Sequence, residues 1–217
     1  MERREFLTGM AATAVLGTNA KASTLPVPAS GRIGFKVLRN GTHVGEYHTI
    51  FTRQGQDLTV LSEAGLVVRL AGIPVFRYRA RVAEHWSAGV FQKVDSHVDD
   101  GVRRLWVHVR RATKGYDIQG THVPRYMGPL DTLPLTYWNK AMLQAMIVNV
   151  QTAHSYPAIV HSPGWNKLPT ANGGTLVAQR YNVTGKLHLT VWYDQAGQWA
   201  GLQFHKHGNV LFEKIVT

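Results

Sequence analysis

Apolar and polar residues alternate along most of the chain from residue 32 onward, with turn residues at short intervals. The stretch "IGFKVLRNGTHVGEYHTIFTRQGQ" predicts two strands, near 32–39 and 43–53, joined at Asn40-Gly41. Asn-Gly tolerates the positive φ angles of a tight hairpin turn. Similar runs continue to residue 120 and resume after residue 173. The pattern therefore predicts ten or so antiparallel strands connected mainly by short turns.

One segment departs from this alternation. In "DTLPLTYWNKAMLQAMIVNVQ" the spacing becomes helical, and Pro134 suits the first turn of a helix. The residues at this spacing are Leu135, Trp138, Met142, Ala145, Met146 and Asn149. We expect a helix over about 134–147. The flanking segments, 120–133 and 152–172, are rich in Gly, Pro, His and Trp and are predicted to be ordered loops.

These elements predict a mainly β fold in a single domain. A long antiparallel meander with one apolar face must curl or close to cover that face and protect its edges. The predicted helix is the natural cover. We expect a strongly bent sheet or partial barrel with one α-helix across its concave side. A two-sheet sandwich is the alternative, but it needs more crossovers than the pattern shows.

The N-terminus has the order of a twin-arginine export signal. Arg3-Arg4 precedes Phe6-Leu7 and a short run of small residues, and Ala20-Lys21-Ala22 fits an A-x-A peptidase site. The apolar run is far too short to span a bilayer. We expect a signal peptide over 1–22, a domain over 23–217 and a periplasmic or otherwise exported protein that keeps no stable membrane anchor after cleavage.

Charge and cysteine content narrow the chemistry further. Cleavage after residue 22 removes three of 24 basic and two of 13 acidic side chains, so the net charge falls only from +11 to +10. Such a field is able to attract anionic lipids, acidic polysaccharides or carboxylate ligands, and export disfavours nucleic acid as a partner. A basic charge that serves only general solubility is the simpler interpretation. The absence of cysteine excludes thiol-linked haem, iron–sulfur clusters and thiolate catalysis. We expect no cofactor.

The stretch "GIPVFRYRARVAEHW" is the most unusual of the predicted strands. Three alternate positions carry Arg77, Arg79 and Arg81, and the opposite face carries Phe76, Tyr78, Ala80 and Val82. If the arginines face the concave side, they mark an anion-binding groove. If they face outward, they form a solvent-exposed ladder with cross-strand ion pairs, and one strand register places Arg81 opposite Glu63. The second interpretation is favoured, with Phe76 and Tyr78 in the core.

Four blocks of the sequence resemble those of a known family. They are "RLAGIPVFRYRARVAEHW", "LTYWN", "NVQT" and "VWYDQAGQWAGLQF". Together they are similar to an exported bacterial family known as domain of unknown function 6134, over nearly the whole domain. That family is in turn similar to exported families whose bent sheet resembles the lipoprotein-carrier half-barrels. The resemblance implies a fold and a compartment, and it implies no reaction.

Other candidate site residues lie in the predicted helix and in the last strands. Trp138 is expected to anchor the helix on the sheet, while Tyr137 and Asn139 present a hydroxyl and an amide to a cavity beneath it. His188, His205 and His207 share a polar strand face and are candidates for a metal site, although solvated histidines are the simpler interpretation. Glu63 and Glu84 are expected to form ion pairs.

Three hypotheses of function remain. The first is a periplasmic binding or carrier-like protein that holds an amphipathic, anionic small molecule or lipid in an apolar groove. Its expected contacts are Tyr137, Trp138, Asn139, Arg77, Arg79 and Arg81. The second is a small enzyme without an organic cofactor, a hydrolase, lyase or isomerase, that uses His85, Glu84 or Tyr137 in the same cavity. The third is a histidine-based metal-binding protein. No G-x-S-x-G elbow, zinc-protease helix or phosphate-binding glycine loop is present.

Overall fold

The computed structural model describes residues 25–216, and the predicted signal peptide lies outside the described residues. The described part of the chain forms a large sheet and a small one. The strands are β1 (Arg32–Arg39), β2 (Thr42–Gln54), β3 (Asp57–Leu70), β4 (Ile73–Ser87), β5 (Val90–Asp99), β6 (Arg104–Ala112), β7 (Gly115–Gly120), β8 (Val123–Gly128), β9 (Thr132–Pro134), β10 (Met146–Val148), β11 (Ser155–Pro157), β12 (Ile159–Pro169), β13 (Thr175–Thr184), β14 (Leu189–Tyr193), β15 (Trp199–His205) and β16 (Asn209–Lys214).

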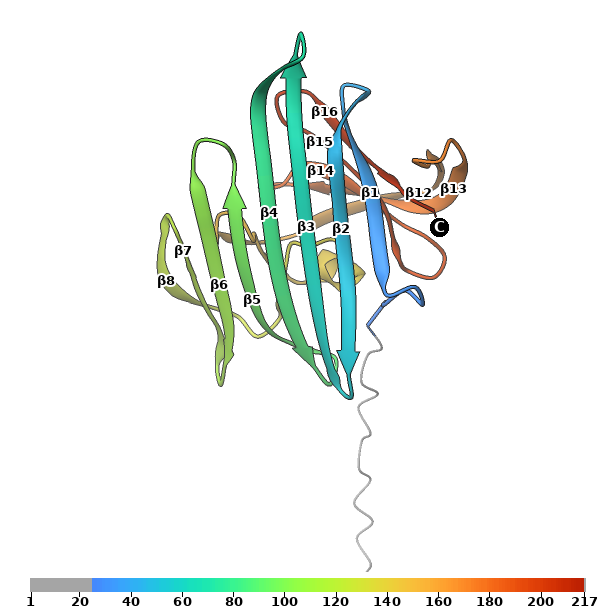
Figure 1. Cartoon of the computed structure of the whole chain (residues 1–217). Coiled ribbons are helices and arrows are strands. Elements are labelled where there is room, and N and C mark those ends of the chain that lie inside the picture. Colours follow the sequence, from blue (N-terminus) through green and yellow to red (C-terminus); the bar gives the residue numbers. More distant parts are fainter. Residues whose placement is uncertain (1–24, 217) are drawn as a thin grey trace, which may run out of the picture.

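The large sheet confirms the mainly β, antiparallel prediction and excludes the sandwich. Its 13 strands follow the order β12-β13-β14-β15-β16-β1-β2-β3-β4-β5-β6-β7-β8. Neighbours in the sheet are neighbours in the chain except β16 and β1, which join the two ends of the domain in the middle of the sheet. The strands bend around one side, and β12 and β8 remain as free edges, so the barrel is not closed (Figure 1).

The predicted α-helix over 134–147 is wrong. The segment instead contains β9, a 3-10 helix over Lys140–Gln144 and β10. Tyr137 has a left-handed φ of 65° and Asn139 is extended, with φ −102° and ψ 106°, so an α-helix cannot pass through them. Asn139 Oδ1 instead accepts a hydrogen bond from the Ala141 N–H and caps the 3-10 helix.

A different element covers the sheet in place of the helix. We call residues 129–158, which connect the edge strand β8 to the edge strand β12, the strap. The strap carries the small sheet, in the order β11-β10-β9, and the 3-10 helix. Trp138 of the strap is fully buried and contacts Phe51 of β2 and Trp86 of β4, at 5.3 and 5.4 Å between ring centroids. The strap therefore lies over the inner face of the large sheet, and Trp138 anchors it.

The segments predicted as loops, 120–133 and 152–172, contain strands in addition to turns. The strands β8, β9 and β11 are short, and β12 is interrupted by a register shift between His161 and Gly164. Because β8 and β12 are edge strands, they tolerate Pro and Gly that would disrupt a central strand. Their pattern therefore looks like that of loops.

No helix in residues 25–216 has the length and apolar character needed to cross a membrane.

Candidate functional site

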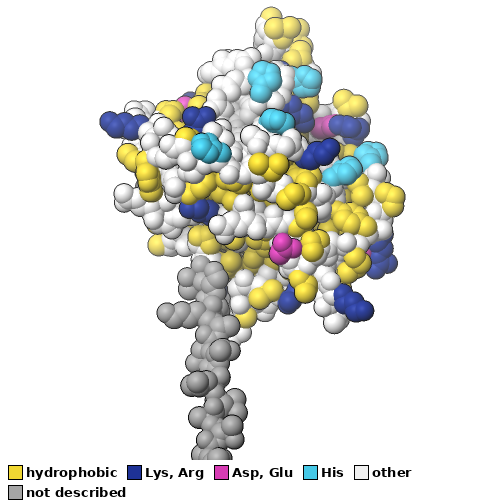
Figure 2. Space-filling model, turned by 180° about the vertical axis from the view of Figure 1, so that it is seen from behind, with side chains coloured by type: hydrophobic (Ala, Val, Ile, Leu, Met, Phe, Trp, Pro, Cys, Tyr) yellow, Lys and Arg dark blue, Asp and Glu magenta, His cyan; other side chains and the backbone are white. Residues whose placement is uncertain are grey.

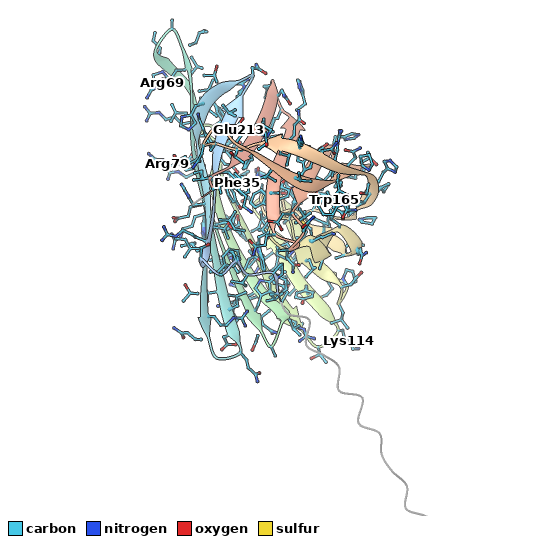
Figure 3. All side chains as sticks on the ribbon, turned by 90° about the vertical axis from the view of Figure 1, so that its right-hand side faces the viewer. Phe35, Arg69, Arg79, Lys114, Trp165 and Glu213 are labelled. Atoms are coloured by element: carbon cyan, nitrogen blue, oxygen red, sulfur yellow. The ribbon has the colours of Figure 1, made fainter. Side chains whose placement is uncertain are left out.

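The arginines of β4 lie on the outer face of the sheet, opposite the strap. Arg77, Arg79 and Arg81 are all exposed, whereas Val82 on the other face is buried. The outward orientation confirms the favoured interpretation, and Figure 3 shows Arg79 on the side of the sheet that faces away from Trp165. Arg81 pairs with Glu63 across the β3–β4 ladder, in the register considered from the sequence. The placement of Phe76 in the core is wrong, because this side chain is 40% exposed.

Two rows of side chains cross five strands on this outer face. One row places Arg79 between Gly65 of β3 and Asp99 of β5, and the next places Arg81 between Glu63 and His97. The full rows are Glu46, Gly65, Arg79, Asp99, Arg104 and His48, Glu63, Arg81, His97, Trp106. These residues line a shallow groove of about 710 Å³, which we call the outer groove. It arises because Gly65 has no side chain, and the space around its Cα on this face is open.

The charges of the outer groove are unevenly paired. Arg81 is held by Glu63, and Arg104 lies 3.7 Å from Asp99. Within residues 25–216, no carboxylate lies within 4 Å of the Arg79 guanidinium. Trp106 at the end of the second row is 36% exposed. The groove therefore combines a free cation, an accessible aromatic ring and the gap beside Gly65.

The inner face carries a buried acid whose role was not predicted. Glu84 is 1% exposed and lies in the core between β3 and β5. The Trp138 and Trp86 indole N–H groups donate to its two carboxyl oxygens, at 2.8 and 2.9 Å. The expected ion pair is absent from the described residues. The alternation of the sequence could have predicted the burial of Glu84, because this residue shares a strand face with the buried residues Val82 and Trp86.

Burial determines the electrostatics of this acid. Desolvation raises the pKa of Glu84 from 4.5 to about 7, while hydrogen bonds from Trp138, Thr136 and Trp86 partly oppose the shift. Burial likewise raises the pKa of Tyr47 to about 12. The core thus contains a carboxyl that is neutral over much of the acidic range. Both of its oxygens are occupied by indole donors, so they are not presented to a substrate.

The other predicted residues of the inner site have structural contacts of their own. Tyr137 is half-buried beside Trp199, 5.4 Å between ring centroids, and its carbonyl accepts from the Tyr193 hydroxyl. Asn139 is used as a cap, and Trp138 is an anchor as expected. Trp138 is fully buried and Asn139 nearly so, and none of the three residues lines the outer groove.

The catalytic candidates are also separated. Glu84 is on the inner face, whereas its neighbour His85 is on the outer face, 3.9 Å from Asp57. The enzyme hypothesis required these groups to converge in one cavity. The two residues cannot act together in one site.

The histidines of the last strands do not form a ligand cluster. The β14–β15 ladder contains a β-bulge at Trp192 and Tyr193, and its last pair is Leu189 with Phe204. His188 precedes this pair and His205 follows it. His205 and His207 are exposed at the β15–β16 turn, where the His207 carbonyl accepts from Arg39. Within residues 25–216 no group of three or more His, Cys, Asp or Glu is placed to hold a metal ion.

Comparisons with known proteins support the fold and the family. The crystal structure of a β-barrel-like protein of domain of unknown function DUF1849 from Brucella abortus matches with a TM-score of 0.56 and 8% identity, covering 85% of this chain and 95% of that one. At this identity the likeness shows the fold alone. No functionally curated protein matches. The family model "Domain of unknown function (DUF6134)" matches residues 35–214, so the chain belongs to this family.

Proposed function

We propose that this protein is an exported binding protein for an anionic, amphipathic small molecule, and that the ligand binds in the outer groove. The observation that carries the proposal is Arg79, a cation without a carboxylate partner in the described chain, beside the gap at Gly65. A guanidinium binds carboxylates, sulfates and phosphates through paired N–H donors. The order of residues 1–22 supports export.

The groove also accommodates the apolar part of such a ligand. Its floor is formed by the backbone of Ala64, Gly65 and Ala80, which is left uncovered because Gly65 has no side chain, and Trp106 forms one end. Ligand sites commonly combine apolar and aromatic surface with a few placed polar groups. The groove is open to solvent, so it suits a flat or partly exposed ligand. The carrier-like hypothesis is kept in this narrower form, with the site moved from the inner to the outer face.

Two substitutions in the groove test the proposal with the anionic fluorophore 8-anilinonaphthalene-1-sulfonate as the probe. Arg79→Gln removes the free cation, and we expect its affinity for the probe to fall about tenfold or more. Gly65→Leu fills the gap and should abolish binding. The added side chain meets open space at its Cβ, and the backbone there is not left-handed, so the fold should tolerate the change.

The matched control is Arg53→Gln, which removes an exposed arginine of β2 outside the groove and should leave binding unchanged. Native mass spectrometry of protein taken directly from the periplasm provides the second measurement. A co-purified anion should be present in the wild type and absent from Arg79→Gln. Wild-type affinity for the fluorophore in both groove variants would exclude the outer groove as the site.

A further inference from the structure

The β3–β4 hairpin extends beyond the rest of the sheet. The ladder between β2 and β3 ends at Gly45 and Leu66, and the ladder between β4 and β5 begins at Arg79 and Asp99. Residues 67–78 therefore form a two-stranded projection that pairs with no other strand of residues 25–216, and we call it the hairpin tip. Figure 1 shows it as the highest point of the sheet. An isolated pair of strands is only marginally stable in water, so a further contact is expected to stabilise this projection.

The end of the hairpin tip is apolar and exposed. Four large hydrophobic side chains lie within seven residues and are Leu70 (70% exposed), Ile73 (66%), Val75 (58%) and Phe76 (40%). Val102, in the adjacent β5–β6 turn, is 88% exposed. Figure 2 shows hydrophobic side chains at the top of the molecule, where the hairpin of Figure 1 ends. Single exposed apolar residues are ordinary, but a contiguous group of them indicates a contact surface.

Cations lie directly behind this apolar end. Arg69, Arg77 and Arg79 are exposed, and the stretch from residue 67 to 79 contains no acidic residue. Figure 3 shows Arg69 and Arg79 on the same side of the sheet. Gly101 of the β5–β6 turn lies against the backbone of Arg77, which brings Arg103 and Arg104 to the base of the hairpin tip. Those two arginines are partly offset by Asp100 and Asp99.

We propose that the hairpin tip docks the protein on an anionic phospholipid bilayer. In this arrangement the side chains of Leu70, Ile73 and Phe76 enter the boundary between headgroups and acyl chains, while the arginines bind lipid phosphates one step further out. The order along the projection, apolar at the end and cationic behind, matches the order of layers that a peripheral protein meets at a membrane. A soluble anion would account for the arginines and would leave the exposed apolar end unexplained.

The absence of cysteine allows a test that reports from the hairpin tip alone. Ile73→Cys, labelled with the polarity-sensitive fluorophore nitrobenzoxadiazole, is mixed as full-length protein with vesicles of phosphatidylcholine and phosphatidylglycerol. We expect a blue shift and an increase in emission, and little change with phosphatidylcholine alone. The matched control is Ile159→Cys, which labels a similarly exposed isoleucine on the distant edge strand β12. Its emission should not change, even if another part of the chain binds the vesicles.

Charge variants in the labelled protein test the cationic half of the proposal. Arg69→Gln and Arg77→Gln should each weaken binding about fivefold, since one arginine near an anionic surface contributes about that factor. Neither residue lines the outer groove, so groove binding of the anionic fluorophore should be retained and the two proposals are tested separately. Arg53→Gln should bind vesicles like the wild type.

Three results would overturn the docking proposal. The first is an unchanged emission at position 73 with anionic vesicles, and the second is an equal response at positions 73 and 159. The third is binding of anionic vesicles by Arg69→Gln and Arg77→Gln with the affinity of the wild type. A blue shift at position 73 without vesicles that grows with protein concentration would assign the tip to a protein contact instead.

Discussion

Glu84 is the residue whose surroundings differ most from what its type predicts. A carboxyl in an apolar row of the inner face is costly when ionised, and two indole N–H donors offset only part of that cost. The unfolded chain releases this proton near pH 4.5 and the folded chain near pH 7. Between these values the folded state binds more protons, so stability decreases as the pH rises and the decrease is complete above about pH 7.

Replacing Glu84 tests this pH dependence directly. Between pH 4.5 and pH 8 the wild type should lose about 3 kcal/mol of unfolding free energy more than Glu84→Gln, which has no proton to release. Urea unfolding at the two pH values measures the difference. Asp131→Asn, at an exposed position, is the control and should keep the wild-type dependence. An identical pH dependence in Glu84→Gln and the wild type would contradict the assignment.

At the scale of elements, the strap shows where local pattern misleads. Leu135, Trp138 and Met142 of the predicted stripe are buried, but its other members Ala145, Met146 and Asn149 are only half-buried. The segment also buries Leu143, Ile147, Val148 and Val150, which do not belong to the stripe, so helical spacing identified only part of the core-facing set. The spacing did not identify the conformation, because Tyr137 adopts a left-handed φ and Asn139 is extended, and neither conformation continues an α-helix. The hairpins were more predictable. Asn40-Gly41 forms the expected turn, since both residues have positive φ.

The attachment of the strap through Trp138 can be measured. Trp138→Phe keeps an aromatic ring against Phe51 and Trp86 but removes the N–H donor to Glu84. We expect a loss of about 1–3 kcal/mol in unfolding free energy, larger at pH 8 than at pH 5, because the bond to an ionised carboxylate is the stronger one.

Trp165→Phe provides the control for this substitution. Trp165 is 50% exposed on β12, so its replacement should change stability by no more than about 0.5 kcal/mol. An equal loss at both pH values in Trp138→Phe would show that packing alone, without the hydrogen bond to Glu84, attaches the strap.

At the scale of the whole molecule, the outer groove could not be predicted although its parts could. Alternation placed Arg77, Arg79 and Arg81 on one face, but it left two registers open, and only the structure shows the one that pairs Arg81 with Glu63. The groove also requires β2, β5 and β6 to be in register with them, and a glycine in the middle. The pairing of β1 with β16 was equally hidden, because a contact between chain ends leaves no local pattern.

The β1–β16 pairing makes a prediction that depends on the entire topology. Lys36 of β1 and Glu213 of β16 are partners in an antiparallel ladder, so a disulfide between cysteines at these positions would close a loop of nearly the whole domain. In the chain-entropy model such a loop stabilises the fold by about 5 kcal/mol, against about 2 kcal/mol for a loop of a few residues.

The short-loop control is a cysteine pair at His205 and Asn209, which are partners across the β15–β16 turn. Urea unfolding of each oxidised variant, compared with its reduced form, measures the two stabilisations. The Lys36–Glu213 cross-link should stabilise the protein more than the control by about 2–3 kcal/mol, because only it restricts the relative positions of the chain ends in the unfolded state. Equal stabilisation would mean that the ends already remain close in the unfolded chain, so that β1 and β16 associate before the intervening strands complete the sheet.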